Sequence, residues 1–103
     1  MAEFVRICGK ADLPGSDEAK EFPCGENKMV CVANVGGELS ALDNVCLHRG
    51  GPLGEGDLEE LIVTCPWHGW QYDLATGECL MNPKANISLY PVSVESEAVW
   101  VEV

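Results

Sequence analysis

Short apolar runs separated by turn residues make up most of the chain, and this pattern predicts strands rather than helices. The alternation is clearest at 98–103, where Val99 and Val101 fall on one face and Trp100 on the other. Apolar residues do not recur at helical spacing over three turns in any window, so at most one turn of helix is expected, at 15–21.

The predicted strands are 3–8, 29–35, 39–42, 58–64, 70–74, 79–81, 89–94 and 98–103. Gly36 and Gly37 form a strong hairpin signal between the second and third of these strands. Strands at this spacing favour an all-β sandwich or barrel. A chain of 103 residues is long enough for one compact domain and too short for two.

Two loops do not fit a plain sandwich. Residues 43–57 combine four glycines and a proline with Cys46, His48 and Arg49, and residues 65–69 have the same character. Because these loops flank a predicted strand pair, we expect a small subdomain, about 43–81, inserted into the sandwich.

Charge limits the partners that the chain can bind. It carries 17 Asp and Glu against 6 Lys and Arg, a formal net charge of −11 at pH 7. Such a chain repels nucleic-acid phosphates and anionic lipids, so neither is expected as a partner. It would be attracted to a protein with a basic docking face, although the acidity could equally serve only to keep the chain in solution.

Six cysteines in 103 residues need an explanation. The amino terminus has no secretory signal pattern, and no segment approaches the ~20 apolar residues of a membrane helix. A cytoplasmic location is therefore expected, where metal binding or burial explains cysteines better than disulfides do. Cys8 and Cys31 lie in apolar strands and are expected in the core, while Cys24 and Cys79 could pair or bind a second metal.

Two cysteine–histidine pairs form the main chemical motif. One residue separates Cys46 from His48, two separate Cys65 from His68, and sixteen lie between the pairs. A two-iron cluster with different ligands on its two irons needs two thiolates and two imidazoles, which these loops supply if they face each other. Zinc is the alternative because it also binds two Cys and two His, but zinc modules usually pair like with like.

The residues around these pairs resemble the Rieske ferredoxins of bacterial ring-hydroxylating dioxygenase systems. The matching segments are 46–54 with Gly56, 65–73, and the turn at 76–77. The resemblance implies a Rieske-like antiparallel β-sandwich or barrel that spans 1–103 as a single domain, with the inserted part, about 43–81, binding one Rieske-type [2Fe–2S] cluster.

The resemblance also implies the ligands of that cluster. Cys46 and Cys65 would bind the buried iron, while His48 and His68 would bind the exposed iron. Three glycines in the loops are expected to let backbone amides approach the sulfides; they are Gly50, Gly51 and Gly69.

Rieske proteins of respiratory complexes differ from this chain at several positions. Gly51 and Trp67 stand where those proteins have a disulfide, and Trp70 replaces a serine that donates to a cluster sulfide. Tyr72 is retained, either as a donor to a cluster sulfur or as an ordinary core aromatic. Fewer donors and several nearby acids disfavour the reduced cluster, which predicts a midpoint potential near the low end of the Rieske range, about −150 mV.

The chain lacks the residues for oxygenase or dehydrogenase chemistry of its own. A ring-hydroxylating oxygenase needs a second iron held by two histidines and a carboxylate, and no histidine is left for it. No strand leads into a glycine-rich dinucleotide motif. The chain is therefore predicted to be an electron carrier and not an enzyme.

We expect a soluble one-electron shuttle, a monomer when free, between a flavin- and NAD(P)H-dependent ferredoxin reductase and a terminal oxygenase. Three alternatives stay open. The chain could be the electron-transfer small subunit of a larger reductase such as nitrite reductase, or a zinc-stabilised structural module. It could also be a redox sensor, which would need a regulatory partner that the sequence does not disclose.

Overall fold

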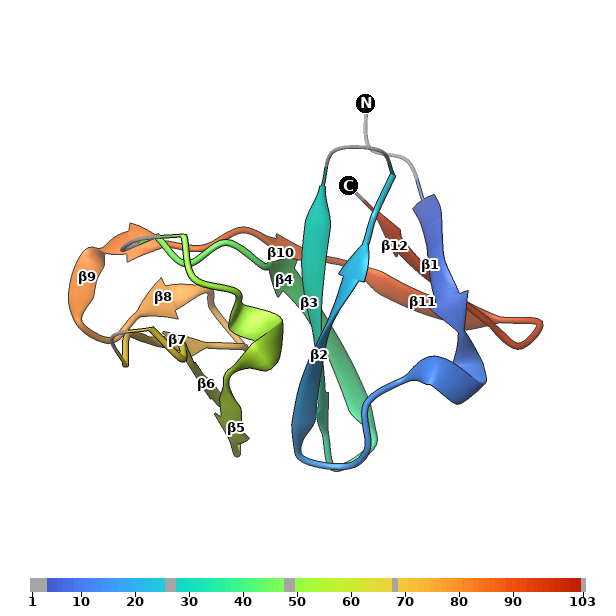
Figure 1. Ribbon diagram of the computed structural model, residues 1–103, viewed down its shortest axis with the longest axis horizontal. Coiled ribbons are helices and arrows are strands. Elements are labelled where there is room, and N and C mark those ends of the chain that lie inside the picture. Colours follow the sequence, from blue (N-terminus) through green and yellow to red (C-terminus); the bar gives the residue numbers. More distant parts are fainter. Residues whose placement is uncertain (1–3, 26–27, 48–49, 68, 103) are drawn as a thin grey trace.

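The computed structural model describes residues 4–25, 28–47, 50–67 and 69–102, which form three antiparallel sheets and two short 3-10 helices (Figure 1). The first sheet contains, in order, β1 (Phe4–Gly9), β12 (Ala98–Glu102) and β11 (Val92–Glu95). The second contains β10 (Leu89–Tyr90), β4 (Glu38–Asp43), β3 (Met29–Val35) and β2 (Glu18–Pro23). The third contains β5 (Asp57–Glu59), β6 (Ile62–Thr64), β7 (Gln71–Asp73), β8 (Glu78–Cys79) and β9 (Asn82–Asn86). The 3-10 helices are η1 (Lys10–Asp12) and η2 (Leu53–Glu55).

Strand β3 of the second sheet is buried on both faces. Val30 and Val32 point into one hydrophobic core, while Cys31 and Ala33 point into another. A strand that is buried on both faces has apolar residues at successive positions, which explains why apolar and polar residues alternate little over 29–35. In Figure 1 the second sheet accordingly lies between β1, β11 and β12 on one side and β5–β9 on the other.

The first core fills the space between the first and second sheets. Val99 and Val101 of β12 are fully buried in it against Val30 and Val32 of β3. Trp100, between the two valines, lies on the opposite face and is half-buried. The alternation predicted for the end of the chain and the all-β antiparallel fold class are both confirmed.

The second core lies between the second sheet and the inserted third sheet. Tyr72, Val63 and Leu53 are fully buried in it, and Leu42 of β4 contacts them from the sandwich side. About 25 cal/mol for each Å² of apolar surface removed from water favours this packing. The third sheet is thereby attached to the sandwich over a continuous apolar interface.

Four elements differ from the sequence-based expectation. The predicted strand 89–94 is two strands, β10 and β11, which belong to different sheets and are separated by Pro91, a residue with no N–H for a strand pairing. Residues 18–23 form the edge strand β2 rather than a turn of helix; their charged side chains suit a sheet edge, where charge discourages pairing with another chain. The predicted strand 58–64 is two strands, β5 and β6, because the chain turns at Glu60, whose φ is +53°. Residues 82–86, for which no strand was predicted, form β9 at the edge of the third sheet.

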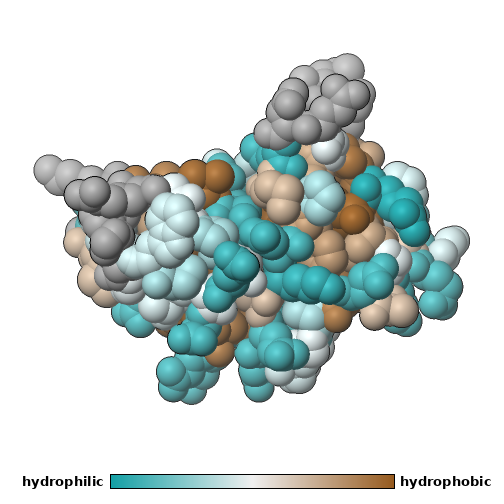
Figure 2. Space-filling model, in the orientation of Figure 1, coloured by the Kyte–Doolittle hydropathy of each residue, from teal (hydrophilic) through white to brown (hydrophobic). Residues whose placement is uncertain are grey.

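Figure 2 shows hydrophilic residues across much of the face seen in that view, in keeping with the excess of acidic side chains. Within the described residues, no helix has the length and apolar character needed to cross a membrane.

Candidate functional site

Each of the two cysteine loops is closed by two backbone hydrogen bonds, and these bonds join equivalent positions in both loops. The Cys46 N–H donates to the carbonyl of Gly51 (2.9 Å), and the Cys65 N–H donates to that of Trp70 (2.7 Å). The N–H of Gly50 donates to the Cys46 carbonyl (2.8 Å), and that of Gly69 to the Cys65 carbonyl (3.1 Å). Each cysteine therefore begins a closed turn of the same size.

Gly50 and Gly69 hold equivalent positions in these turns. Their φ angles are +74° and +75°, a left-handed conformation that costs glycine little and other residues more. Their main role in the structure is thus to close the loops. The predicted approach of their amides to cluster sulfides stays a prediction.

The thiols of Cys46 and Cys65 lie together in the second core. Their side chains are almost completely buried, at 2% and 3% exposure. Burial raises the pKa of the Cys65 thiol, the backbone hydrogen bond from Trp67 lowers it, and the neighbouring Cys46 thiol raises it again. Two adjacent buried sulfurs of this kind favour a positive metal centre, since metals bind cysteine as the thiolate.

Tyr72 links the first loop to strand β7. Its hydroxyl lies 3.2 Å from the Cys46 sulfur and accepts a hydrogen bond from the Leu47 N–H (3.0 Å). Burial and the contact with Cys46 raise the pKa of Tyr72, while the Leu47 N–H lowers it by less. The phenol therefore stays protonated and can donate to a sulfur that has lost its proton, which is one of the two roles that the sequence left open.

Gly51 lies in close contact with the second loop. A Cβ atom at this position would be 2.7 Å from the Cys65 sulfur and 3.0 Å from the Trp67 ring. The space next to the two sulfurs thus excludes any side chain at residue 51. The ring of Trp67 covers this glycine and is 52% exposed, so it lies at the outer edge of the site. Trp70 is half-buried against the second core.

Asn44 fixes the base of the first loop to the sandwich and is a residue that the sequence did not single out. It is 5% exposed; its Nδ2 donates to Glu21 Oε2 (2.8 Å), and its Oδ1 accepts from the N–H of Gly54 (2.7 Å). Its carbonyl accepts from the Leu53 N–H (2.9 Å). The strand before Cys46 and helix η2 are therefore tied to each other and to β2.

The structure brings together only part of the predicted ligand set. Cys46 and Cys65 are neighbours, but His48 and His68 lie outside the described residues, as does Arg49. In the part of the chain that is described, no group of three or more potential metal ligands occurs. The prediction that all four residues bind one metal centre is therefore not tested by the geometry.

The other four cysteines are buried and free. Cys31 lies in the second core and Cys8 in the first, as expected for apolar strand residues. Cys24 belongs to the first core and Cys79 to the second, so these two do not pair.

The residues present fit an iron–sulfur cluster. Two buried thiols from separate loops face one another, a tyrosine hydroxyl is within reach of one sulfur, and the glycine opposite the other leaves no room for a side chain. This is the environment of a shielded, thiolate-bound centre that two loops share.

Comparison with known proteins agrees with this reading. The model of the Rieske [2Fe-2S] domain matches residues 3–91. The chain is 36% identical over 78 residues to the ferredoxin component of the naphthalene 1,2-dioxygenase system of Pseudomonas aeruginosa, covering 75% of each chain. It is 33% identical over 100 residues to the 3-phenylpropionate/cinnamic acid dioxygenase ferredoxin subunit of Shigella flexneri, covering 95% of this chain and 92% of that one.

Solved structures give the same picture. The ferredoxin of Sphingomonas yanoikuyae B1 superposes with a TM-score of 0.85 at 30% identity, covering 98% of this chain and 99% of the other. A putative NADH-dependent nitrite reductase small subunit from Mycobacterium tuberculosis superposes equally well, with a TM-score of 0.86, but at 18% identity it shows only a shared fold.

The fold and the paired thiols thus define a small β-protein in which two loops of the same form bring two buried thiols together. The chain belongs to the Rieske [2Fe–2S] domain family. The predictions of a Rieske ferredoxin with one [2Fe–2S] cluster, and of an electron carrier rather than an enzyme, are confirmed.

Proposed function

We propose that this protein is the ferredoxin of a multicomponent ring-hydroxylating oxygenase. It accepts one electron from a flavin- and NAD(P)H-dependent ferredoxin reductase and passes it to a terminal oxygenase. The observation that carries the proposal is the pair of equivalent closed loops, whose cysteines are buried side by side. The relatives described above, which are ferredoxins of dioxygenase systems, support it.

Four residues are proposed as the cluster ligands. Cys46 and Cys65 would hold one iron as thiolates, and His48 and His68 would hold the other through their imidazoles. When bound, the cluster supplies a one-electron redox couple. The Tyr72 hydroxyl, 3.2 Å from the Cys46 sulfur, would donate a hydrogen bond to the thiolate and so favour the more negative, reduced charge state.

Each of the two loops that carry these ligands has an exposed apolar side chain. Leu47 is 48% exposed and Trp67 is 52% exposed, and each is next to or between residues of a ligand pair. Large apolar groups at the surface favour protein contact because docking removes them from water. We therefore place the electron-transfer contact at this end of the molecule.

The remaining features of the proposal follow from the same reading. We propose that residues 1–103 form one domain, with about 43–81 as its cluster-binding part, and that the carrier is a monomer in the cytoplasm when free. Gel filtration of natively extracted protein tests this, since a small subunit of a nitrite reductase would elute with its larger partner.

The decisive experiment is to measure visible absorption and EPR spectra of anaerobically purified protein before and after dithionite. We expect a brown protein that bleaches on reduction and a reduced EPR signal shifted from that of an all-cysteine cluster. Cys46→Ser should remove or alter the signal, while Cys24→Ser, at a buried cysteine of the other core, should leave it unchanged. A colourless protein that holds zinc after reconstitution with iron and sulfide would overturn the proposal.

A further inference from the structure

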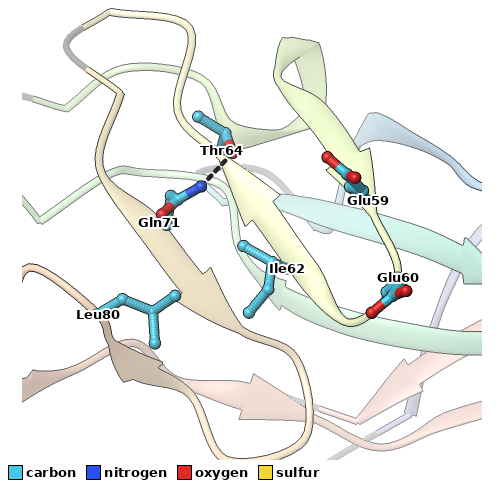
Figure 3. A pocket seen from close by; sticks show the side chains of 6 residues that line it. All are labelled: Glu59, Glu60, Ile62, Thr64, Gln71 and Leu80. Atoms are coloured by element: carbon cyan, nitrogen blue, oxygen red, sulfur yellow. Dashed lines mark hydrogen bonds between the residues drawn. The ribbon is translucent and has the colours of Figure 1, made fainter.

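A groove lies on the outer face of the inserted sheet, beside the second ligand loop (Figure 3). It encloses about 230 Å³, which is smaller than the roughly 300–1,000 Å³ of small-molecule sites. The groove therefore has room for a single side chain of a partner protein. Its lining comprises Glu59, Glu60, Ile62, Thr64, Gln71 and Leu80.

The strand register explains why this face is open. Val63 of β6 and Tyr72 of β7 point into the second core, so their neighbours Ile62, Thr64 and Gln71 point outward. These three side chains are partly exposed, and Figure 3 shows them on one side of the sheet. Gln71 Nε2 donates to Thr64 Oγ1 (3.3 Å), so the two polar side chains at this end are joined to each other.

The middle of the groove is apolar and partly open to solvent. Ile62 lies at its centre in Figure 3, and Leu80 lies across from it at 46% exposure. Two further large apolar side chains of adjoining turns are also exposed, Leu61 at 46% and Met81 at 51%. Exposed apolar groups gathered in this way are typical of a contact surface.

The other end of the groove is acidic. Glu59 and Glu60 are both exposed, and their carboxylates lie on the side of Ile62 away from Leu80 in Figure 3. Residues 50–81 contain no Lys or Arg at all, so the charge of this part of the chain comes from carboxylates. They belong to Glu55, Asp57, Glu59, Glu60, Asp73 and Glu78.

We propose that this groove receives a lysine or arginine side chain from the basic face of an electron-transfer partner protein. The aliphatic stem of such a side chain would lie on Ile62 and Leu80, and its charged end would meet Glu59 and Glu60. This inference rests on the proposed function and adds to it a second contact, distinct from the apolar loop tips.

Two arguments favour this occupant over others. The uncompensated negative charge of residues 50–81 attracts a basic surface and repels an acidic one, which speeds productive encounters and orients them. In addition, Thr64 at one end of the groove directly precedes Cys65 in the chain. A partner held in the groove thus lies beside the second ligand loop, where an electron can be exchanged.

The test uses the cluster-loaded protein and cytochrome c, a basic haem protein, as the probe. Stopped-flow absorbance gives the second-order rate at which the reduced protein reduces cytochrome c at low salt. Removing both groove charges with Glu59→Gln/Glu60→Gln should lower this rate about five- to tenfold, because each contact with an exposed charge is worth a few-fold. The difference should shrink at about 0.5 M salt as the charges are screened.

Matched variants distinguish the effect of a contact in the groove on this rate from the effect of a change in net charge. Glu38→Gln/Glu95→Gln removes the same number of exposed carboxylates from the sandwich and should lower the rate less than twofold. Leu80→Ser should slow cytochrome c without any change in charge, whereas Val94→Ser, at a comparably exposed position on β11, should not. The visible spectrum, the EPR signal and the midpoint potential of each variant are measured as well, so that an intact cluster is confirmed and any change in driving force is separated from a change in docking.

Carbodiimide cross-linking of the complex, followed by peptide mapping, locates the contact without depending on electron transfer. Cross-links at Glu59 or Glu60 support the proposal. Cross-links confined to carboxylates of the sandwich, or a groove variant that behaves like the sandwich variant, overturn it. Failure of the proposed function is recognised separately, by a missing cluster signal or by no electron transfer to any acceptor.

Discussion

The substitution Asn44→Ala tests whether the first ligand loop depends on its attachment to the sandwich. It removes the side chain that accepts a hydrogen bond from the Gly54 N–H at 2.7 Å and donates one to Glu21 Oε2 at 2.8 Å. The backbone bonds of residue 44 to Leu53 and Met29 stay possible, so the loop loses its side-chain anchor alone.

The size of the effect follows from the burial of these groups. The Gly54 N–H is buried and loses its acceptor, which costs about 1–3 kcal/mol. The bond to the half-buried Glu21 adds about 1 kcal/mol, because water can replace part of it. We expect a total loss of about 2–4 kcal/mol from a domain whose stability is on the order of 5–15 kcal/mol.

Urea unfolding of the loaded protein, followed by far-UV circular dichroism and by the visible absorbance of the cluster, measures this loss. A drop of about 2 M in the midpoint is expected. The control is Asn34→Ala, which removes the same kinds of bond: Nδ2 donates to the Pro14 carbonyl (3.0 Å) and Oδ1 accepts from the Gly37 N–H (2.8 Å). Because that site is more exposed, its loss should be about 1 kcal/mol.

The cluster distinguishes a local effect from general destabilisation. In Asn44→Ala the EPR signal should broaden or shift below the unfolding transition, since the base of the first loop is released. In Asn34→Ala it should not change. If the two variants lose the same stability and keep the same spectrum, Asn44 does not position the loop and the reasoning is refuted.

Three further outcomes are expected. Tyr72→Phe removes the donor 3.2 Å from the Cys46 sulfur and should lower the midpoint potential by about 40 mV, the equivalent of one ~1 kcal/mol hydrogen bond; an unchanged potential in a redox titration would contradict this role. Gly51→Ala places a Cβ 2.7 Å from the Cys65 sulfur and should reduce cluster occupancy in iron and sulfide analysis, whereas Gly15→Ala, which meets only a flexible side chain, should not. Burial raises the pKa of Cys31 from 9.0 to about 12. Above pH 9 the thiol ionises in the unfolded chain before it does so in the folded one, so the folded state loses stability as the pH rises toward 12. The loss is about 2 kcal/mol at pH 10.5. Unfolding free energies between pH 8 and 10.5 should therefore fall more steeply for the natural chain than for Cys31→Ala.

The closeness of the two motif cysteines could be predicted because the residues of the motif are few and closely spaced. Cys46 and Cys65 were identified from the distance of each to a histidine, and the fold places the two thiols together. The strand at the end of the chain could be predicted because Val99 and Val101 alternate with residues of the opposite face, and one face of that sheet is buried.

The attachment of the loops could not be predicted, because it depends on contacts between distant residues. Asn44 and Glu21 are 23 positions apart, and neither lies in a pattern that indicates burial. Strand β2 was missed for a related reason: its charged residues hide the alternation that Phe22 and its neighbours show once the strand pairs with β3. Local propensity carries little information about an edge strand whose position is set by tertiary packing.

The predicted low midpoint potential depends both on the charges near the site and on the hydrogen-bond donors near its sulfurs. Residues 50–81 carry six carboxylates and no Lys or Arg, so this part of the chain opposes the addition of an electron. The Tyr72 hydroxyl lies 3.2 Å from the Cys46 sulfur, and Trp70 occupies the position of the serine donor of respiratory Rieske proteins.

Both features lower the potential, and we expect about −150 mV, the low end of the Rieske range. An EPR-monitored redox titration measures it. Because surface carboxylates are screened by salt, the potential should also rise as ionic strength increases. Glu59→Gln/Glu60→Gln should raise the potential at low salt for the same reason. A midpoint well above zero, or one that neither salt nor these substitutions move, would mean that the ligands and their immediate donors set the potential and that the surrounding carboxylates do not.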